Sequence, residues 1–140
     1  MQVQKLPEGP PPEFLHMTDD QMVSHVTSLV ETLVKDDGLN PEQLIVLTND
    51  TDIRQGLLSQ QAAGIPFTYL ENEGGIPVET VHRFKGLERD AVIMAMDIHR
   101  KEDDIRAMTY VGMSRARSVL YVLADQQLKE IIHWDGSSGE

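Results

Sequence analysis

Three short runs of consecutive apolar residues constrain the fold of this chain more than any other feature. The runs are residues 44–48, 91–96 and 119–124, and each is rich in branched or bulky side chains. A run without polar alternation is typical of a strand that is buried on both faces, as in a parallel sheet covered by helices. Because amphipathic stretches separate these runs, we expect an α/β fold with a mainly parallel sheet flanked by helices.

The remaining elements are predicted from caps, turns and periodicity. Thr18 and Gln21 form a capping-box pattern that opens a helix ending near Gly38. Asn49 or Thr51 is expected to cap the next helix, which the sequence around Gly64 closes. Further strands are expected at 13–17, 67–70 and 78–82, and further helices at 103–115 and 126–133. Residues 1–12 form a Pro-rich extended lead-in, residues 13–134 form one domain, and residues 135–140 form a disordered tail.

The composition excludes several classes of protein. The chain has 140 residues, which fits a single domain, and it contains no cysteine, so disulfides, thiol catalysis and cysteine zinc sites are excluded. We expect no metal to be held by this chain. The longest apolar run is six residues, far short of a transmembrane helix or a signal-peptide core. A soluble, cytoplasmic protein that does not bind membranes is therefore expected.

The charge is unevenly distributed along the chain. A net charge of −11 by itself disfavours nucleic acid, which an acidic surface repels. Residues 79–117, however, hold eight of the twelve Lys and Arg residues against seven acidic ones. This segment is either a solvated face or a binding surface, and charge alone does not decide between them.

Residues 80–88, TVHRFKGLE, are the richest in groups that bind ligands. In parallel α/β sheets, ligands bind next to the carboxyl ends of the strands. We therefore expect ligand-binding sites in the loop after Leu47, in residues 83–90 and at the helix end around Arg115. Thr80 and His82 are able to donate to phosphate oxygens, and Glu88 is able to accept from ribose hydroxyls. The alternative is a polar loop with a turn glycine and a packed histidine.

Residues 110–117, YVGMSRAR, form the second notable segment. Gly112 inside a helix costs roughly 1 kcal/mol relative to alanine, so close packing or close approach of a ligand must offset it. The planar fork of Arg115 suits phosphate oxygens and charge that develops in phosphoryl transfer. The alternative is that Arg115 and Arg117 only stabilise a helix C-terminus, where cations are favoured.

Together the two segments resemble motifs V and VI of the UvrD/Rep-type superfamily 1 helicases. The order is that of the family, and AVIMAM and SVLYVLA follow the two motifs as strands do in its members. Residues 44–70 are similar to the strand, helix and strand that precede motif V, including the AGIP corner. The resemblance covers roughly residues 13–124, and it implies the second RecA-like motor domain, 2A, of an ATP-driven translocase.

The resemblance also implies roles for individual residues. Arg115 matches the motif VI arginine finger that acts on the ATP γ-phosphate, and Glu88 matches the motif V glutamate that contacts the ribose. Thr80 and His82 match positions that face single-stranded DNA. Arg83 and Lys85 are expected to join the DNA contact, and Gly86 to shape the loop beside the nucleotide. Tyr110 and Arg106 lie in the approach to motif VI.

The resemblance implies ATP with Mg²⁺ as the cofactor, and single-stranded DNA and an N-terminal P-loop helicase domain as partners. A Walker A loop needs a Gly-Lys dipeptide, and this chain contains none, so we expect it to be inactive alone and to complete an ATP site on that other domain. DNA repair is the expected setting. A stand-alone module that binds single-stranded nucleic acid, or one that binds a protein partner, remains the alternative.

Overall fold

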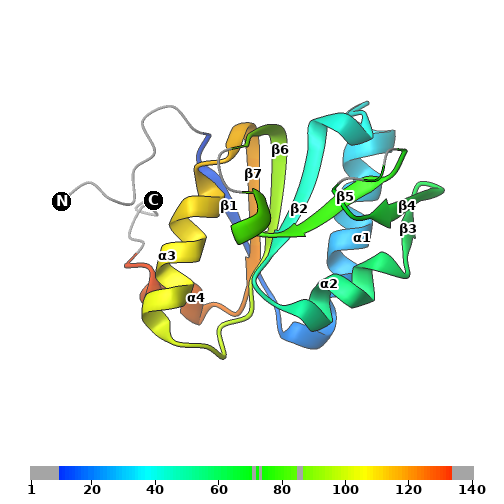
Figure 1. Ribbon diagram of the computed structural model, residues 1–140. Helices are drawn as coiled ribbons and strands as arrows, with labels where there is room; N and C mark the ends of the chain where they lie inside the picture. The colour runs from blue at the N-terminus through cyan, green and yellow to red at the C-terminus, as the bar shows by residue number, and fades with distance from the viewer. Residues whose placement is uncertain (1–9, 71, 73, 85–86, 134–140) are drawn as a thin grey trace.

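The computed structural model describes residues 10–70, 72, 74–84 and 87–133 and contains one mainly parallel sheet (Figure 1). The strands are β1 Pro12–His16, β2 Leu44–Thr48, β3 Gln61–Ala62, β4 Ile65–Thr68, β5 Ile76–Thr80, β6 Arg89–Ala95 and β7 Ala116–Ala124. The sheet order is β1-β7-β6-β2-β5-β4-β3, and every neighbouring pair is parallel except the β3–β4 hairpin. The predicted α/β class is confirmed.

The helices follow the strands as expected for this class. They are α1 Asp19–Lys35, α2 Thr51–Leu58, α3 Glu102–Met113 and α4 Gln127–Ile131, with short 3-10 turns η1 Pro41–Gln43 and η2 His82–Phe84. At the start of α1, the Gln21 side chain accepts a hydrogen bond from the backbone N–H of Thr18 at 3.1 Å, as the capping-box pattern predicts. All five side chains of β2 are buried, which explains its unbroken apolar sequence.

The helices cover both faces of the sheet. Chain connections from β1 to β2 and from β2 to β5 run in one direction across the sheet, whereas those from β5 to β6 and from β6 to β7 run in the other. Right-handed crossovers therefore place α1 and α2 on one face and η2 and α3 on the other, as Figure 1 shows. A Cβ built on Gly112 of α3 would lie 2.3 Å from Met94 Cε, so close packing against β6 explains this helix glycine.

Three local predictions are wrong. Helix α2 is capped by Asp50, whose carboxylate accepts from the backbone N–H of Asp52 at 2.9 Å, rather than by Asn49 or Thr51. The helix ends at Leu58, because residues 61–68 form the β3–β4 hairpin around Ala63 and Gly64, both with positive φ. Strand β5 ends at Thr80, and His82 begins η2 instead of ending the strand.

Of the two predicted end segments, the lead-in is partly described and the tail is not described. Strand β1 already begins at Pro12, the last residue of the predicted lead-in, whereas residues 1–9 and the predicted tail lie outside the described residues. Among the described helices, none is long and apolar enough to cross a membrane.

Candidate functional site

The predicted site residues lie at two opposite edges of the sheet. Thr80, His82 and Arg83 follow the carboxyl end of β5, whereas Glu88 and Arg115 directly precede β6 and β7. We expected the helix end around Arg115 at the carboxyl edge, and this placement is wrong. In a β-α-β unit, the helix returns the chain to the amino edge before the next strand begins, so Arg115 lies at that edge.

The crossover from β5 to β6 connects the two edges without a long helix. The backbone N–H of Val81 donates to Thr48 of β2 at 3.2 Å, and those of Phe84 and Leu87 donate to Val81 and Phe84, both at 3.2 Å. The Phe84 side chain is fully buried and anchors the middle of the crossover. These hydrogen bonds attach the described residues of the crossover to β2 and to one another.

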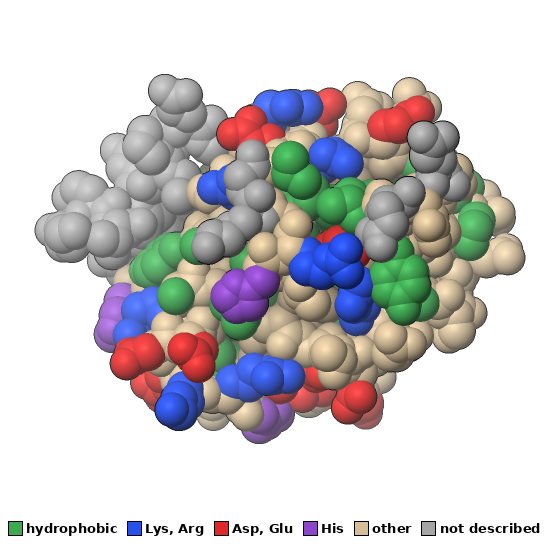
Figure 2. Space-filling view, in the orientation of Figure 1, with side chains coloured by type: hydrophobic (Ala, Val, Ile, Leu, Met, Phe, Trp, Pro, Cys, Tyr) green, Lys and Arg blue, Asp and Glu red, His purple; other side chains and the backbone are tan. Residues whose placement is uncertain are grey.

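Polar groups gather where β5 ends. His82 is exposed, and the backbone N–H of Arg83 lies 3.4 Å from Thr80 Oγ1. Figure 2 shows Lys and Arg side chains beside a histidine near the centre of this face. The structure thus brings Thr80, His82 and Arg83 together. Lys85 and Gly86 lie outside the described residues.

A buried carboxylate, which the sequence analysis did not single out, lies beneath this group. The Glu79 side chain is fully buried, and both its oxygens lie 3.1 Å from Nη2 of Arg54, a residue of α2. Nε of Arg83 lies 3.5 Å from Glu79 Oε1, and the Arg54 guanidinium covers the Tyr69 ring at 4.7 Å. The only sequence signal was a glutamate in an otherwise apolar strand, and the arginine from α2 carried none.

At the amino edge, Arg115 folds back over the end of α3. Its Nε donates to the Val111 carbonyl at 3.2 Å, its Nη2 donates to Ser114 Oγ at 2.9 Å, and its Nη1 donates to the Leu87 carbonyl at 3.3 Å. The backbone carbonyl of Arg115 also accepts from the N–H of Arg89 at 3.0 Å. Arg115 is therefore joined directly to the end of the crossover.

Glu88 lies beside Arg115 in the fold, but its cationic partner is Arg117. Arg117 Nη1 lies 3.9 Å from Glu88 Oε1, and Arg117 Nε donates to Asp90 at 3.1 Å. Hydrogen bonds from Gln43 and then Arg117 lower the pKa of Asp90. About half of the Glu88 and Arg117 side-chain surfaces is exposed, so solvent screens this pair.

Within the part of the chain that the structure describes, the side chains of Tyr110 and Arg106 connect α3 to the end of α4. The Tyr110 hydroxyl donates to the Ile132 carbonyl, and Arg106 Nε donates to the Ile131 carbonyl at 2.8 Å. Burial raises the pKa of Tyr110. Both side chains therefore hold the end of α4 against α3.

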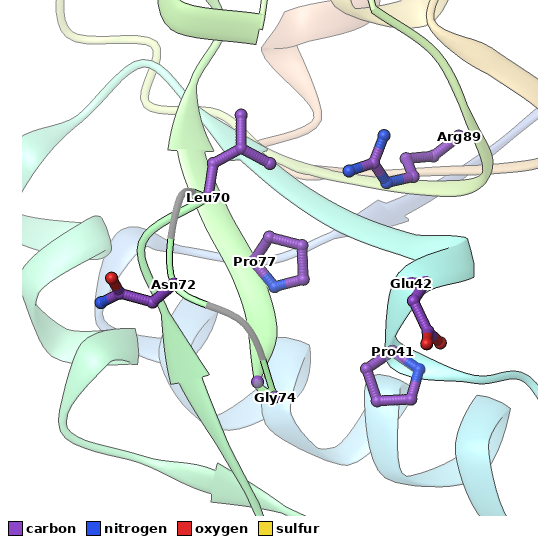
Figure 3. A pocket seen from close by; sticks show the side chains of 8 residues that line it. Pro41, Glu42, Leu70, Asn72, Gly74, Pro77 and Arg89 are labelled. Atoms are coloured by element: carbon purple, nitrogen blue, oxygen red, sulfur yellow. The ribbon is translucent and has the colours of Figure 1, made fainter.

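A pocket of about 530 Å³ opens beside Arg89 at the start of β6. Figure 3 shows the Arg89 side chain directed toward Leu70 and Pro77, with Pro41 and Glu42 lining another wall. The Arg89 guanidinium stacks on the Phe84 ring at 5.3 Å, and its buried Nε has no hydrogen-bond partner among the described residues. Among the described residues, the lining combines apolar side chains with the Arg89 cation, the Glu42 carboxylate and the Asn72 amide.

A second polar cluster links the loop after β6 to the start of α1. His99 Nδ1 lies 2.7 Å from Asp97 Oδ1 and 3.2 Å from Asp19 Oδ2, and the three ligand atoms of this group lie within 4.8 Å of one another. Hydrogen bonding to Asp97 raises the pKa of His99, and burial and the Asp97 charge raise that of Asp19. The pKa of Asp97 is lowered overall. Burial acts to raise it, but the hydrogen bonds from His99 have the larger combined effect. The side chains of Asp19, Asp97 and His99 are of the kind that bind a divalent cation. Their contacts with one another, however, are enough to explain why the three side chains lie together.

A mainly parallel sheet with helices on both faces places this domain in the α/β class, and the arrangement is consistent with a RecA-like fold. Residues 76–123, which contain both motifs, match the sequence model of the UvrD-like helicase C-terminal domain. Residues 76–123 are therefore similar to the UvrD-like helicase C-terminal domain, in line with the resemblance of the two motifs.

Solved structures share the fold, and one of them is described as the C-terminal domain of a possible DNA helicase from Lactobacillus plantarum WCFS1. The identity is 23% and the TM-score 0.62, over 89% of this chain and 83% of that one. No curated protein sequence matches the chain significantly.

Proposed function

We propose that this chain is the C-terminal motor domain of an ATP-dependent superfamily 1 DNA helicase. In this proposal, an N-terminal P-loop domain holds ATP and Mg²⁺, and this chain supplies Arg115 to the γ-phosphate and Glu88 to the ribose. Residues at the end of β5 contact single-stranded DNA. These are Thr80, His82, Arg83 and Lys85, with Gly86 shaping the loop. DNA repair is the proposed setting.

The observation that carries this proposal is the crossover between the two edges. Thr80 and Arg83 lie at its start, and the Leu87 carbonyl at its end accepts a hydrogen bond from Arg115. In this proposal, a change at the phosphate is passed to the strand-binding end through the hydrogen bonds of Val81, Phe84 and Leu87 and the buried Phe84 side chain. This geometry suits a motor that couples hydrolysis to movement along DNA.

The residues at the amino edge fit the nucleotide that the family implies. ATP bound there supplies the phosphoanhydride bond that water cleaves. Arg115 has to leave its contacts with Ser114 and Leu87 to meet the γ-phosphate, and those contacts are with neutral oxygens that a phosphate outcompetes. The Glu88 carboxylate, about half exposed, is available to accept hydrogen bonds from ribose hydroxyls.

The decisive experiment measures DNA-stimulated ATP hydrolysis by a protein that joins this chain to a P-loop helicase domain. Arg115→Ala should lower kcat by about 10³-fold or more, while ATP affinity changes little. Arg115→Lys, which keeps the charge but loses the planar fork, should recover only a small part of the rate. Turnover within a few fold of wild type in Arg115→Ala would exclude Arg115 from the ATP site.

The alternative function is a binding module that works without hydrolysis. The cationic group at the end of β5 favours single-stranded nucleic acid over a protein as its ligand. Such a module would bind DNA with the same affinity whether or not ATP and a P-loop domain are added. A DNA affinity that changes with the nucleotide state would favour the motor instead.

A further inference from the structure

The pocket beside Arg89 lies where two strands of the sheet separate. The pairing of β2 with β5 begins only at Val46 and Val78, although Pro77 already pairs with Thr68 of β4. Pro77 has no N–H to offer to a neighbouring strand. In addition, the crossover after β5 holds the short η2 in place of a long helix. The start of β5 is therefore left open, and the pocket of about 530 Å³ occupies this space (Figure 3).

Arg89 brings a positive charge to this pocket without an acidic partner. Among the described residues, its side chain makes one hydrogen bond, from Nη1 to the Glu88 carbonyl at 3.0 Å, and its buried Nε makes none. The guanidinium stacks on the Phe84 ring at 5.3 Å, and Figure 3 shows the side chain directed toward Leu70 and Pro77. A partly buried guanidinium with unused donors favours a ligand that offers hydrogen-bond acceptors.

The other lining groups restrict the ligand further. Glu42 contributes a carboxylate, which accepts hydrogen bonds, and within the described part of the chain it forms no ion pair with Arg89. The two opposite charges favour a neutral ligand over a phosphate, which Glu42 would repel. Pro41, Leu70 and Pro77 supply apolar surface on which a flat ring packs. The lining therefore suits a flat, neutral molecule with acceptors on one edge and a donor on another.

We propose that this pocket binds a purine ring that carries an exocyclic amine, as the base of a free nucleotide. Arg89 donates to a ring nitrogen and Glu42 accepts from the amine, because an aminopurine presents both kinds of group on its edges. The choice of a nucleotide rests on the proposed function, which places a ribose beside Glu88, the residue before Arg89. Pro41, Glu42 and Leu70 lie outside residues 76–123, so the family match does not assign this pocket.

The test is an NMR titration of the 140-residue chain with adenosine. Adenosine carries the purine ring, the amine and the ribose but no phosphate, so its binding does not need a group that holds phosphate. A ligand of this size should bind with a Kd of about 0.1–1 mM. Arg89→Met, which has no donor, should weaken binding about tenfold. Arg89→Lys, which lacks the planar fork, should recover only part of the affinity.

A second ligand tests the contact between Glu42 and the amine. Purine riboside lacks the amine and should bind wild type about fivefold more weakly than adenosine does. In Glu42→Ala the two ligands should bind equally. Glu13→Ala removes an exposed carboxylate from the edge strand β1 and is the matched control, so it should keep the fivefold difference. The same difference in Glu42→Ala as in wild type would overturn the role of Glu42.

A further variant tests the pocket without changing its charges. Leu70→Trp places a larger side chain in the lining and should abolish adenosine binding, which also replaces Arg89→Met if that variant does not fold. Failure of adenosine to bind wild type would overturn the proposal. Binding that neither Arg89→Met nor Leu70→Trp weakens would overturn it as well.

Other ligands separate this inference from the proposed function. ATP should shift the same pocket resonances as adenosine, whereas oligo-dA should not, and the reverse result would overturn the assignment to a free nucleotide. If adenosine binds but the chain joined to a P-loop domain does not hydrolyse ATP, the motor function fails and the pocket stands. If the joined protein hydrolyses ATP but the chain does not bind adenosine, the pocket fails and the motor function stands.

Discussion

The two edges of the sheet hold their charges in different ways. At the end of β5, the Glu79 carboxylate has no exposed surface and is fixed by Arg54. At the amino edge, Glu88 and Arg117 are 3.9 Å apart and each is more than half exposed. A buried pair is costly to break, whereas an exposed pair exchanges easily with water. The difference teaches that the charges at the end of β5 are held in fixed positions, whereas those at the amino edge are free to change partners.

The largest expected effect on stability comes from breaking the buried pair. Arg54→Ala removes the closer of the two cations beside the buried Glu79 carboxylate and leaves only Arg83, whose Nε lies 3.5 Å from one oxygen. We therefore expect a loss of about 3 kcal/mol in the free energy of unfolding, the lower end of the range for a broken buried pair. Urea unfolding followed by circular dichroism gives this value. A loss below about 1 kcal/mol would mean that Arg83 compensates Glu79 on its own, and the contrast between the edges would disappear.

The turn between β4 and β5 leads directly into β5, the strand that carries Glu79, so it tests how rigidly that strand is held. A Cβ on Gly75 would lie 2.4 Å from Thr68 Cγ2 and 2.7 Å from the Pro66 carbonyl oxygen. Since backbone cannot move aside as a flexible side chain does, Gly75→Ala should cost about 1–3 kcal/mol. The urea midpoint should fall while the m-value stays constant. An unchanged midpoint would show that this turn adjusts freely.

The exposed pair at the amino edge should show a much smaller effect. Arg117→Ala removes the partner of Glu88 and Asp90, yet we expect a change of only about 0–1 kcal/mol in the free energy of unfolding. This effect should shrink further in 0.5 M salt, which screens exposed charges. A loss comparable to that of Arg54→Ala would remove the distinction between the two edges.

The smallest expected effect is the pH dependence contributed by His99. Its pKa is raised above 6.5 in the folded protein, so the folded state binds more protons than the unfolded state in the window just above pH 6.5. The His99 contribution to stability is therefore fully present below that window and lost as pH rises through the folded pKa. NMR titration of the His99 ring gives its pKa directly.

The matched control for this titration is His25, an exposed histidine on α1 whose ring contacts the Gln21 carbonyl. In His99→Gln, the fall in thermal midpoint just above pH 6.5 should diminish, and in His25→Gln it should persist. A His99 pKa at or below 6.5 would contradict the ion pairs with Asp97 and Asp19.

Much of the fold follows from local sequence. The apolar run at residues 44–48 gives β2 with the predicted bounds, and the capping pattern at Thr18 gives the start of α1. The β3–β4 hairpin was not predicted, because Ala63 adopts positive φ only within a turn that pairing of Ala62 with Ile65 holds in place. Strong hydrophobic patterns along the sequence therefore predict helices and strands, whereas a short strand pair such as β3–β4 depends on the contacts that its residues make in the folded chain.

The sequence by itself determined the parallel α/β class, the two motifs and their similarity to the UvrD-like helicase C-terminal domain. Only the tertiary structure decided that Arg115 lies at the amino edge, that Arg117 pairs with Glu88, and that Arg54 neutralises Glu79. The physical reason is that runs and motifs are local along the chain, whereas charge compensation acts through space. Arg54 and Glu79 are 25 residues apart in sequence, and only the crossing of α2 over the end of β5 brings them together.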